Sequence, residues 1–287
     1  MSYLDRLAAI HRWDPSAYRP FTIDGVQVGR VTADTTALLA EFPEVFRVGD
    51  HAVALADDLR DLDVRSEAVH AAMAALAGRG AVRTPRGETY GVSESWAAPT
   101  RLKLDRGMVP IFGVKSYGVH VNGFVRGADG LQMWIGTRAA DKRIAPSKLD
   151  HMVAGGLGHG YSVDETMVKE AAEEADVPAG LARQARPVGA LFYVTEIAEL
   201  ERGLRDDTLF VFDLELPADF VPRNTDGELA GFELWPIADV MARVRESDDF
   251  KFNVGPVLID FFLRHGLLDP DTDPDYLPLV RGLHGDG

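Results

Sequence analysis

The pattern of hydrophobic and polar positions predicts short helices and strand pairs over the first third of the chain. Helices are expected at residues 3–11, 32–42 and 63–77, and hairpins at residues 21–31 and 45–55. The dipeptides Asp24-Gly25 and Gly49-Asp50 supply the turns that such hairpins favour. The polar stretch 84–106 holds several prolines and glycines, and we expect it to connect this region to the rest of the chain.

From about residue 109 the apolar segments become longer and predict alternating strands and helices. Strands are expected at residues 117–126, 131–138, 188–194, 208–216 and 233–236, and helices at 163–175, 237–245 and 257–265. The Asp/Pro-rich tail beyond Pro270 is expected to be loose. The pattern therefore predicts an α/β protein, with a smaller α+β domain over residues 1–106 and a second domain over residues 107–287.

Composition and charge exclude several classes of partner and of functional site. The 287 residues hold 30 Lys and Arg against 45 Asp and Glu, a formal charge of −15, which disfavours binding to a nucleic acid polymer. No uncharged apolar run approaches the ~18 residues of a membrane span, so no membrane partner is expected. Cysteine is absent, which excludes disulfides, thiolate metal sites and a cysteine nucleophile, and fits a cytoplasmic location.

The most informative stretch is residues 154–177, AGGLGHGYSVDETMVKEAAEEADV. Ser162 and Glu165 form a capping box that predicts the helix start. On a helical wheel, one face carries Val168, Ala171, Ala172 and Ala175, and the nearly opposite face carries Glu170, Glu173 and Glu174. A run of glutamates on one face is commonly a solvated surface, which is the simplest interpretation.

Two features favour a ligand site over a solvated face. Glu170 and Glu174 are like charges one turn apart, which is unfavourable unless something neutralises them. The preceding residues, 151–163, hold four glycines and no Asp, Glu, Lys or Arg, and such a loop lets backbone N–H groups approach a ligand. Carboxylates beside a glycine-rich loop suit Mg²⁺ or Mn²⁺, which bridge protein oxygens to substrate phosphates.

The spacing resembles the Nudix box, G-x5-E-x7-R-E-U-x-E-E-x-G-U, in which U is apolar. Gly155 falls on its first glycine, residues 169–174 fall on R-E-U-x-E-E, and Val177 falls on the last apolar position. The resemblance implies an α/β/α sandwich with a mixed sheet. It also implies that Glu170, Glu173 and Glu174 are metal ligands and that Gly155 and Gly156 lie at the substrate.

Three positions depart from the box. Tyr161 stands at the first glutamate, Lys169 at the arginine and Asp176 at the glycine. Lys169 keeps the charge but not the two-pronged geometry of arginine. Because of Tyr161 and Asp176, a Nudix-fold ligand-binding or sensor protein without hydrolase activity remains the alternative to an enzyme.

Further segments resemble one Nudix subgroup, termed thiamin pyrophosphokinase-like, whose members carry an uncharacterised N-terminal domain. The segments are residues 118–123, Trp134-Ile135, Arg138, Lys142, 148–150, Phe252-Asn253 and 259–266. The resemblance implies Mg²⁺-dependent hydrolysis of a diphosphate linkage in a small nucleoside-diphosphate-like substrate. Oxidised thiamin diphosphate, cleaved to the monophosphate, is the substrate that it suggests, and a homodimer is the family-level expectation.

The chemistry requires a base and cations. We expect Glu174 and Glu170 to be catalytic, with either Glu170 or Glu228 as the base; Glu228 is equally well interpreted as a turn residue. Arg138, Lys142 and Lys148 precede the glycine-rich loop and are expected to bind the substrate's phosphates, although Lys142 also fits an exposed loop charge. His120 is expected to be a hydrogen-bonded strand residue. The tryptophans Trp96, Trp134 and Trp235 are expected in the core.

Overall fold

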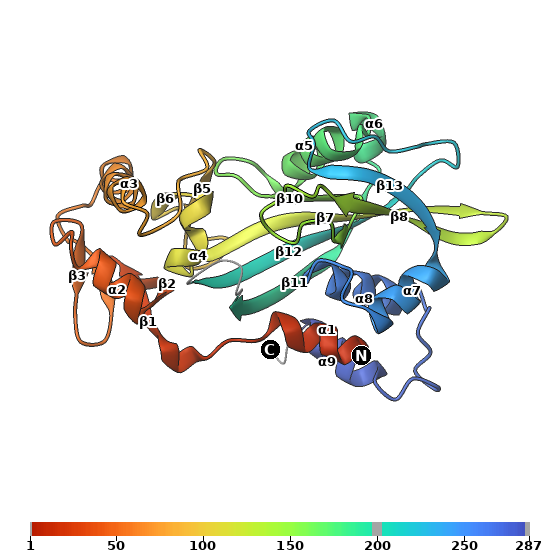
Figure 1. The fold of residues 1–287 in the computed structure, drawn as a ribbon, viewed down its shortest axis with the longest axis horizontal. Coiled ribbons are helices and arrows are strands. Elements are labelled where there is room, and N and C mark those ends of the chain that lie inside the picture. The colour runs from red at the N-terminus through yellow and green to blue at the C-terminus, as the bar shows by residue number, and fades with distance from the viewer. Residues whose placement is uncertain (1, 197–202, 285–287) are drawn as a thin grey trace.

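The structure is a computed structural model, and it describes residues 2–196 and 203–284 (Figure 1). The helices are α1 (Tyr3–Ile10), α2 (Ala33–Leu39), α3 (Leu62–Gly78), α4 (Val109–Phe112), α5 (Val163–Ala175), α6 (Ala179–Ala182), α7 (Ile237–Glu246), α8 (Val254–Arg264) and α9 (Tyr276–His284), with 3-10 turns η1 (Pro15–Ala17) and η2 (Arg106–Met108). The strands are β1 (Tyr18–Ile23), β2 (Val26–Thr32), β3 (Phe46–Val48), β4 (Val53–Leu55), β5 (Thr89–Val92), β6 (Leu102–Asp105), β7 (Lys115–Gly127), β8 (Gly130–Arg138), β9 (Leu149–Asp150), β10 (Val153–Gly156), β11 (Arg186–Glu196), β12 (Leu204–Glu215) and β13 (Leu229–Pro236).

The N-terminal region is built on a four-stranded sheet in the order β2-β1-β4-β3. Both predicted hairpins are confirmed, and Asp24 and Gly25 take the left-handed backbone conformation that a tight turn between β1 and β2 requires. Helix α3 and the small β5-β6 sheet complete this region. Its core is a cluster of aliphatic and aromatic side chains around Phe21, Phe46 and Phe112.

The segment predicted to be a connection, residues 84–106, is itself structured. It contains β5 and β6, and Tyr90, Val92, Leu102 and Leu104 are buried in the N-terminal core. The expectation missed these strands because each has only four residues, and the prolines and glycines around them dominate the sequence pattern. The domain boundary at residue 106 stays a prediction.

The second sheet is mixed and has the order β11-β12-β7-β8-β13. Strand β7 is parallel to β12, whereas its other neighbours are antiparallel. The sheet forks along β7, because its first half pairs with β10 and its second half pairs with β8. Helices α5 and α6 cover one face and α7 and α8 the other (Figure 1), which confirms the predicted α/β/α sandwich.

Two predictions about the C-terminal part are corrected. The tail beyond Pro270 is not loose throughout, because α9 packs beside α1 and buries Leu279 and Leu283 against the cluster that holds Leu7. The apolar residues of this helix have helical spacing, but a run of Asp and Pro precedes them and hides the signal. In the glycine-rich stretch, Gly155 and Gly156 belong to strand β10 rather than to a loop. Within the described residues, no helix is long and apolar enough to cross a membrane.

Candidate active site

Helix α5 carries the predicted carboxylates and begins and ends where the sequence predicts. The capping box is present, since the Ser162 hydroxyl accepts from the Glu165 N–H and the Glu165 carboxylate accepts from the Ser162 N–H. At its C-terminus Asp176 has a left-handed conformation, with φ of 54°. This explains why the Nudix box has a glycine at that position, and Asp tolerates the conformation better than most residues do.

The three glutamates do not lie on one solvated face. Glu174 is only 5% exposed, and its carboxylate accepts the N–H of Ala154 on β10 at 2.7 Å. Glu170 is mostly buried against the same strand, whereas Glu173 is exposed. Lys169 pairs with both, with Glu170 at 3.2 Å and with Glu173 at 2.7 Å. Ala172, expected on the packed face, is exposed instead. The hydrophobic pattern was misleading here because it counts every carboxylate as a solvent-facing group.

Burial raises the pKa of Glu174 well above its ordinary value, and the nearby charge of Glu170 raises it further. Burial also raises the pKa of Glu170. In the described part of the chain, no three His, Asp or Glu side chains already converge as a ligand set. The donors nevertheless fit an oxygen-preferring cation, because Glu170 and Glu174 are partly or fully buried carboxylates one turn apart, and a cation bound between them would relieve their repulsion.

Gly155 and Gly156 shape the site because they have no Cβ, which leaves room for neighbouring side chains. A Cβ at Gly155 would lie 2.1 Å from Cγ of Glu170, and a Cβ at Gly156 would lie 1.7 Å from the hydroxyl of Tyr90. Because successive strand residues face opposite sides, β10 is approached on one face by a carboxylate from α5 and on the other by a tyrosine from the N-terminal region. Only glycine admits both side chains.

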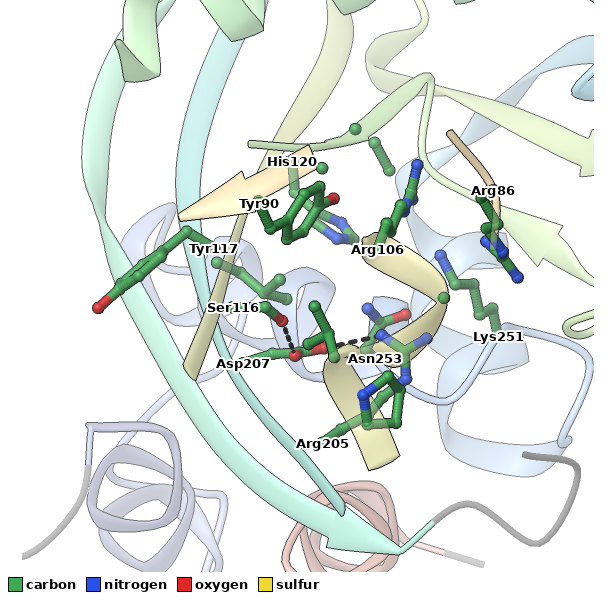
Figure 2. A pocket seen from close by; sticks show the side chains of 18 of the residues that line it. Arg86, Tyr90, Arg106, Ser116, Tyr117, His120, Arg205, Asp207, Lys251 and Asn253 are labelled. Atoms are coloured by element: carbon green, nitrogen blue, oxygen red, sulfur yellow. Dashed lines mark hydrogen bonds and ion pairs between the residues drawn. The ribbon is translucent and has the colours of Figure 1, made fainter. Parts of the chain in front are cut away.

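A cavity lined by cations lies beside β10. It has two adjoining chambers, of about 100 Å³ and about 290 Å³, which share Arg86, Arg106, Arg205 and Lys251 as well as Ala154 and Asn253. We call these chambers the cationic cavity. Figure 2 shows the charged ends of the four basic residues gathered around one space, although they come from four separate segments of the chain.

The electrostatics of the cationic cavity favour an anion. Burial lowers the pKa of Arg86, and the charges of Arg106, Arg205 and Arg143 lower it further. Burial also lowers the pKa of Lys251, against the opposing effect of Asp150. Clustered positive charges raise each other's energy until an anion neutralises them. Their convergence in a chain of net charge −15 makes this cavity suited to an anion.

Polar groups without partners line the same cavity. Nε of Arg205 and Oδ1 of Asn253 are buried and have no hydrogen-bond partner among the described residues. Asp207 holds Arg205 in place at 3.1 Å and accepts hydrogen bonds from Ser116 and Tyr193. Buried polar atoms are normally satisfied, so unpartnered ones at a cavity wall suggest that a ligand or water completes them.

The three predicted phosphate-binding cations have different positions. Arg138 lines the larger chamber, but its guanidinium donates to Asp150 at 2.7 Å and to the Ile144 carbonyl. Lys142 lines the same chamber and pairs with Glu228 at 3.3 Å. Lys148 lines neither chamber, and its ammonium group donates to the carbonyl oxygen of Asp248.

The loop that carries Glu228 is fixed to helix α5. The N–H of Arg223 donates to the Ala175 carbonyl at 3.1 Å, and the hydroxyl of Thr225 donates to the Glu173 carbonyl. Glu228 itself follows a turn at Gly227 and lines the larger chamber. The turn and the site interpretations of Glu228 are thus compatible, because the turn holds its carboxylate at the cavity.

Other predicted side chains divide between core and surface. His120 is buried on β7, and its Nδ1 lies 2.8 Å from Nδ1 of His151, as expected for a hydrogen-bonded strand histidine. Trp134 is buried and Trp235 is partly buried against the core. The prediction for Trp96 is wrong, because its side chain is 49% exposed.

Sequence reasoning missed Arg86, Arg106, Arg205 and Lys251. No common motif or spacing links them, since each is a single cation in a different segment and only the fold brings them together. The signal that was available is weak. Lys251 immediately precedes the Phe252-Asn253 pair that resembles the subgroup, but the resemblance itself assigns it no role.

A mixed sheet between two helical layers, with a capped helix that presents glutamates to a glycine-containing strand, is the architecture of a Nudix-type α/β hydrolase. Two plant proteins are similar over most of the chain. Nudix hydrolase 24, chloroplastic, from Arabidopsis thaliana is 41% identical over 268 residues, and Nudix hydrolase 20, chloroplastic, from the same plant is 38% identical over 274 residues. Each match covers 92% of this chain and 72% of the relative.

The chain belongs to the Nudix hydrolase family, and it is a Nudix-type diphosphate hydrolase. A family model described as a domain of unknown function (DUF4743) matches residues 2–116, in agreement with the expected uncharacterised N-terminal region. Among solved structures, the MutT protein from Methanosarcina mazei Go1 is 17% identical, with a TM-score of 0.39 over 53% of this chain and 96% of that chain. The thiamin pyrophosphokinase-like subgroup stays a prediction.

Proposed function

We propose that the protein uses Mg²⁺ or Mn²⁺ to hydrolyse the diphosphate linkage of a small nucleoside-diphosphate-like substrate. Oxidised thiamin diphosphate, cleaved to the monophosphate, is the candidate that the sequence resemblance suggests. The observation that carries the proposal is the meeting of two features at strand β10. The carboxylates of Glu170 and Glu174 contact this strand, and the cationic cavity adjoins it at Ala154.

The metal ligands would be Glu170, Glu173 and Glu174. Glu170 and Glu173 would exchange their contacts with Lys169 for the metal ion, and Glu170 and Glu174 already lie against β10. A bound divalent cation supplies neutralisation of charge that develops on the phosphates and lowers the pKa of water.

The chain's own cations would hold the substrate. Arg86, Arg106, Arg205 and Lys251 surround the space for the phosphates, with Lys142 and Arg138 at the wall of the larger chamber. Guanidinium groups bind phosphate oxygens in pairs, which fixes the orientation of the diphosphate relative to β10. We assign no phosphate contact to Lys148, because its ammonium group points to Asp248. Gly155 and Gly156 act through the space that they leave for Glu170 and Tyr90.

The reaction then needs one proton acceptor. The oxygen of a water molecule attacks one phosphorus, the bridging P–O bond breaks, and a carboxylate takes the water's proton. Glu228 is suited to this role by its position on the larger chamber, and Glu170 by a raised pKa that makes it a better base. Comparison of Glu228→Gln with Glu170→Gln tests which glutamate is the base. Loss of the base lowers kcat and removes the acidic limb of the pH profile of kcat.

A hydrolysis screen with Mg²⁺ tests the substrate class. The panel contains thiamin diphosphate, its oxidised analogues, oxidised deoxynucleotides, ADP-ribose and dinucleoside polyphosphates. We expect the highest kcat/KM for an oxidised thiamin diphosphate. A preference for oxidised deoxynucleotides over every thiamin compound would contradict this substrate, and no turnover of any compound would favour a binding or sensor protein. The cytoplasmic location also stays a prediction, and the two plant relatives are named chloroplastic.

A further inference from the structure

A second pocket continues from the cationic cavity along strand β7. It has a volume of about 140 Å³ and shares Tyr90, Ser116 and Tyr117 with the smaller cationic chamber. We call it the aromatic pocket, after the side chains that dominate it: Tyr90, Trp96, Tyr117, His159 and Tyr161. Figure 2 shows that Tyr117, which lies on the boundary, points away from the gathered cations.

The two spaces differ sharply in charge. The larger cationic chamber is lined by six Arg or Lys side chains besides Lys142, against the single acidic residue Glu228. The described lining of the aromatic pocket contains no Asp, Glu, Lys or Arg. A continuous groove with one cationic end and one uncharged aromatic end is complementary to a molecule that has an anionic end and a flat, uncharged or delocalised end.

Two of the pocket's aromatic side chains are exposed. Trp96 is 49% exposed and Tyr161 is 52% exposed. The Trp96 ring lies 4.7 Å from the ring of Tyr117 and 4.9 Å from that of Phe210, so its neighbours hold it in place while part of its surface faces solvent. A fixed, partly exposed aromatic ring at a pocket wall offers a surface on which a planar ligand stacks.

We propose that the aromatic pocket binds a planar aromatic heterocycle of the substrate while the cationic cavity holds its diphosphate. The proposal rests on the proposed function and adds the place where the ring attached to the diphosphate binds, with the side chains that hold it. It gives the N-terminal region a role, since Tyr90 and Trp96 come from β5 and the segment that follows it. It also accounts for Tyr161, which stands where the Nudix box has its first glutamate.

The junction between the two spaces fits one continuous ligand. The Tyr90 hydroxyl lies against Gly156, so the tyrosine contacts the same strand as the catalytic carboxylates. Along β7, Tyr117 lines both spaces, whereas Gly118 and His120 line only the cationic one. A substrate bound along β7 would therefore place its ring at Trp96 and Tyr117 and its phosphates beside β10.

Equilibrium binding measured by calorimetry in EDTA tests the proposal without turnover. The probes are ADP, which carries an aromatic ring, and inorganic pyrophosphate, which does not. We expect Trp96→Ala to weaken ADP binding about tenfold and to leave pyrophosphate binding within twofold of wild type. Trp96→Phe keeps a ring and is expected to retain binding within threefold. Arg106→Ala is expected to weaken both probes.

Trp13→Ala is the matched control, because Trp13 also packs edge-to-face on a tyrosine, Tyr18, but lines none of these cavities. It should change neither affinity. The proposal is overturned if Trp96→Ala weakens pyrophosphate as much as ADP, or if it changes neither. These results are independent of hydrolysis, so an absence of turnover in Mg²⁺ would contradict the proposed function while the binding pattern still decides the role of the aromatic pocket.

Discussion

At the residue scale, Gly155 and Gly156 decide which side chains reach the site. Neither takes a positive φ, so their requirement for glycine comes from the close approach of neighbouring side chains and not from backbone strain. The sequence comparison placed Gly155 in the Nudix box and implied contact with substrate. The structure adds a steric reason, since Glu170 fills the space beside Gly155 and Tyr90 fills the space beside Gly156.

Gly156→Ala should therefore destabilise the fold by about 1–3 kcal/mol, because its Cβ would overlap the Tyr90 hydroxyl. Urea unfolding measures the change in the free energy of unfolding. Tyr90→Phe in the same chain should recover part of the loss by removing that hydroxyl. Gly231→Ala is the control, because a Cβ on that strand glycine meets nothing within 4 Å. Equal costs for both glycine variants would show that the contact with Tyr90 is not the cause.

At the element scale, α5 shows what can be predicted from sequence and what cannot. Its bounds and its capping box follow from local side-chain chemistry and were predicted correctly. The side chain of Glu174 is buried because β10, in the sheet beneath α5, offers it the N–H of Ala154. A hydrophobic pattern cannot predict that a carboxylate is buried by such a hydrogen bond.

A contact between a histidine on β7 and one in the segment between β9 and β10 makes the protein sensitive to acid. His151 is buried against His120, with the rings at 90° and Nδ1 to Nδ1 at 2.8 Å. Burial lowers the pKa of His151 to about 4; Asp150 opposes this shift, and Lys251 adds to it. Above pH 6.5 the histidine is neutral in both states. As the pH falls towards 4, the unfolded chain binds a proton that the folded chain does not, and stability is lost.

We expect the free energy of unfolding of wild type to fall by up to about 3 kcal/mol from this group between pH 6.5 and pH 4. His151→Asn removes the titrating group and should flatten this dependence, although it also lowers stability at pH 7. Urea unfolding at several pH values measures both effects. His70→Asn on the exposed face of α3 serves as control. An unchanged slope for His151→Asn would refute the assignment.

At the scale of the whole molecule, the N-terminal region and the Nudix sheet share a site and a core. Arg86, Tyr90 and Arg106 reach the cavity from the region matched by the family of unknown function. Helix α1, although first in the chain, packs with α8 and α9 on the Nudix sheet (Figure 1). Neither relation could be predicted from the sequence, because both depend on contacts between segments roughly 40 to 270 residues apart, and such contacts leave no local pattern.

Removal of Arg106 tests the shared site. Arg106→Ala should raise KM about tenfold or more for every diphosphate substrate, because the cation lines both chambers, and should change kcat less. Steady-state kinetics provides both constants. Arg106 also pairs with Glu88 at 2.8 Å. Arg79→Ala breaks a similar pair, with Glu41 on the surface, and should leave both constants unchanged. A KM that stays at the wild-type value in Arg106→Ala would remove the N-terminal region from substrate binding.

Truncation of Leu7 tests the shared core. Leu7 is buried beside α9, with its Cδ1 close to Gly282, so Leu7→Ala should cost about 2–5 kcal/mol. Val64→Ala on the exposed face of α3 should cost much less. Urea unfolding provides the comparison, and similar small costs for the two variants would show that α1 contributes little to the core of the Nudix sheet.

The central claim is that the carboxylates of α5 and the cationic cavity together hydrolyse a diphosphate. Release of monophosphate product, with Mg²⁺ and with EDTA, tests it for wild type and for Glu174→Gln, which keeps the shape of the buried side chain. We predict turnover by wild type in Mg²⁺ only, and a loss of at least about 100-fold in kcat for a folded Glu174→Gln protein. Wild-type rates in Glu174→Gln, or equal rates in EDTA, would contradict the account.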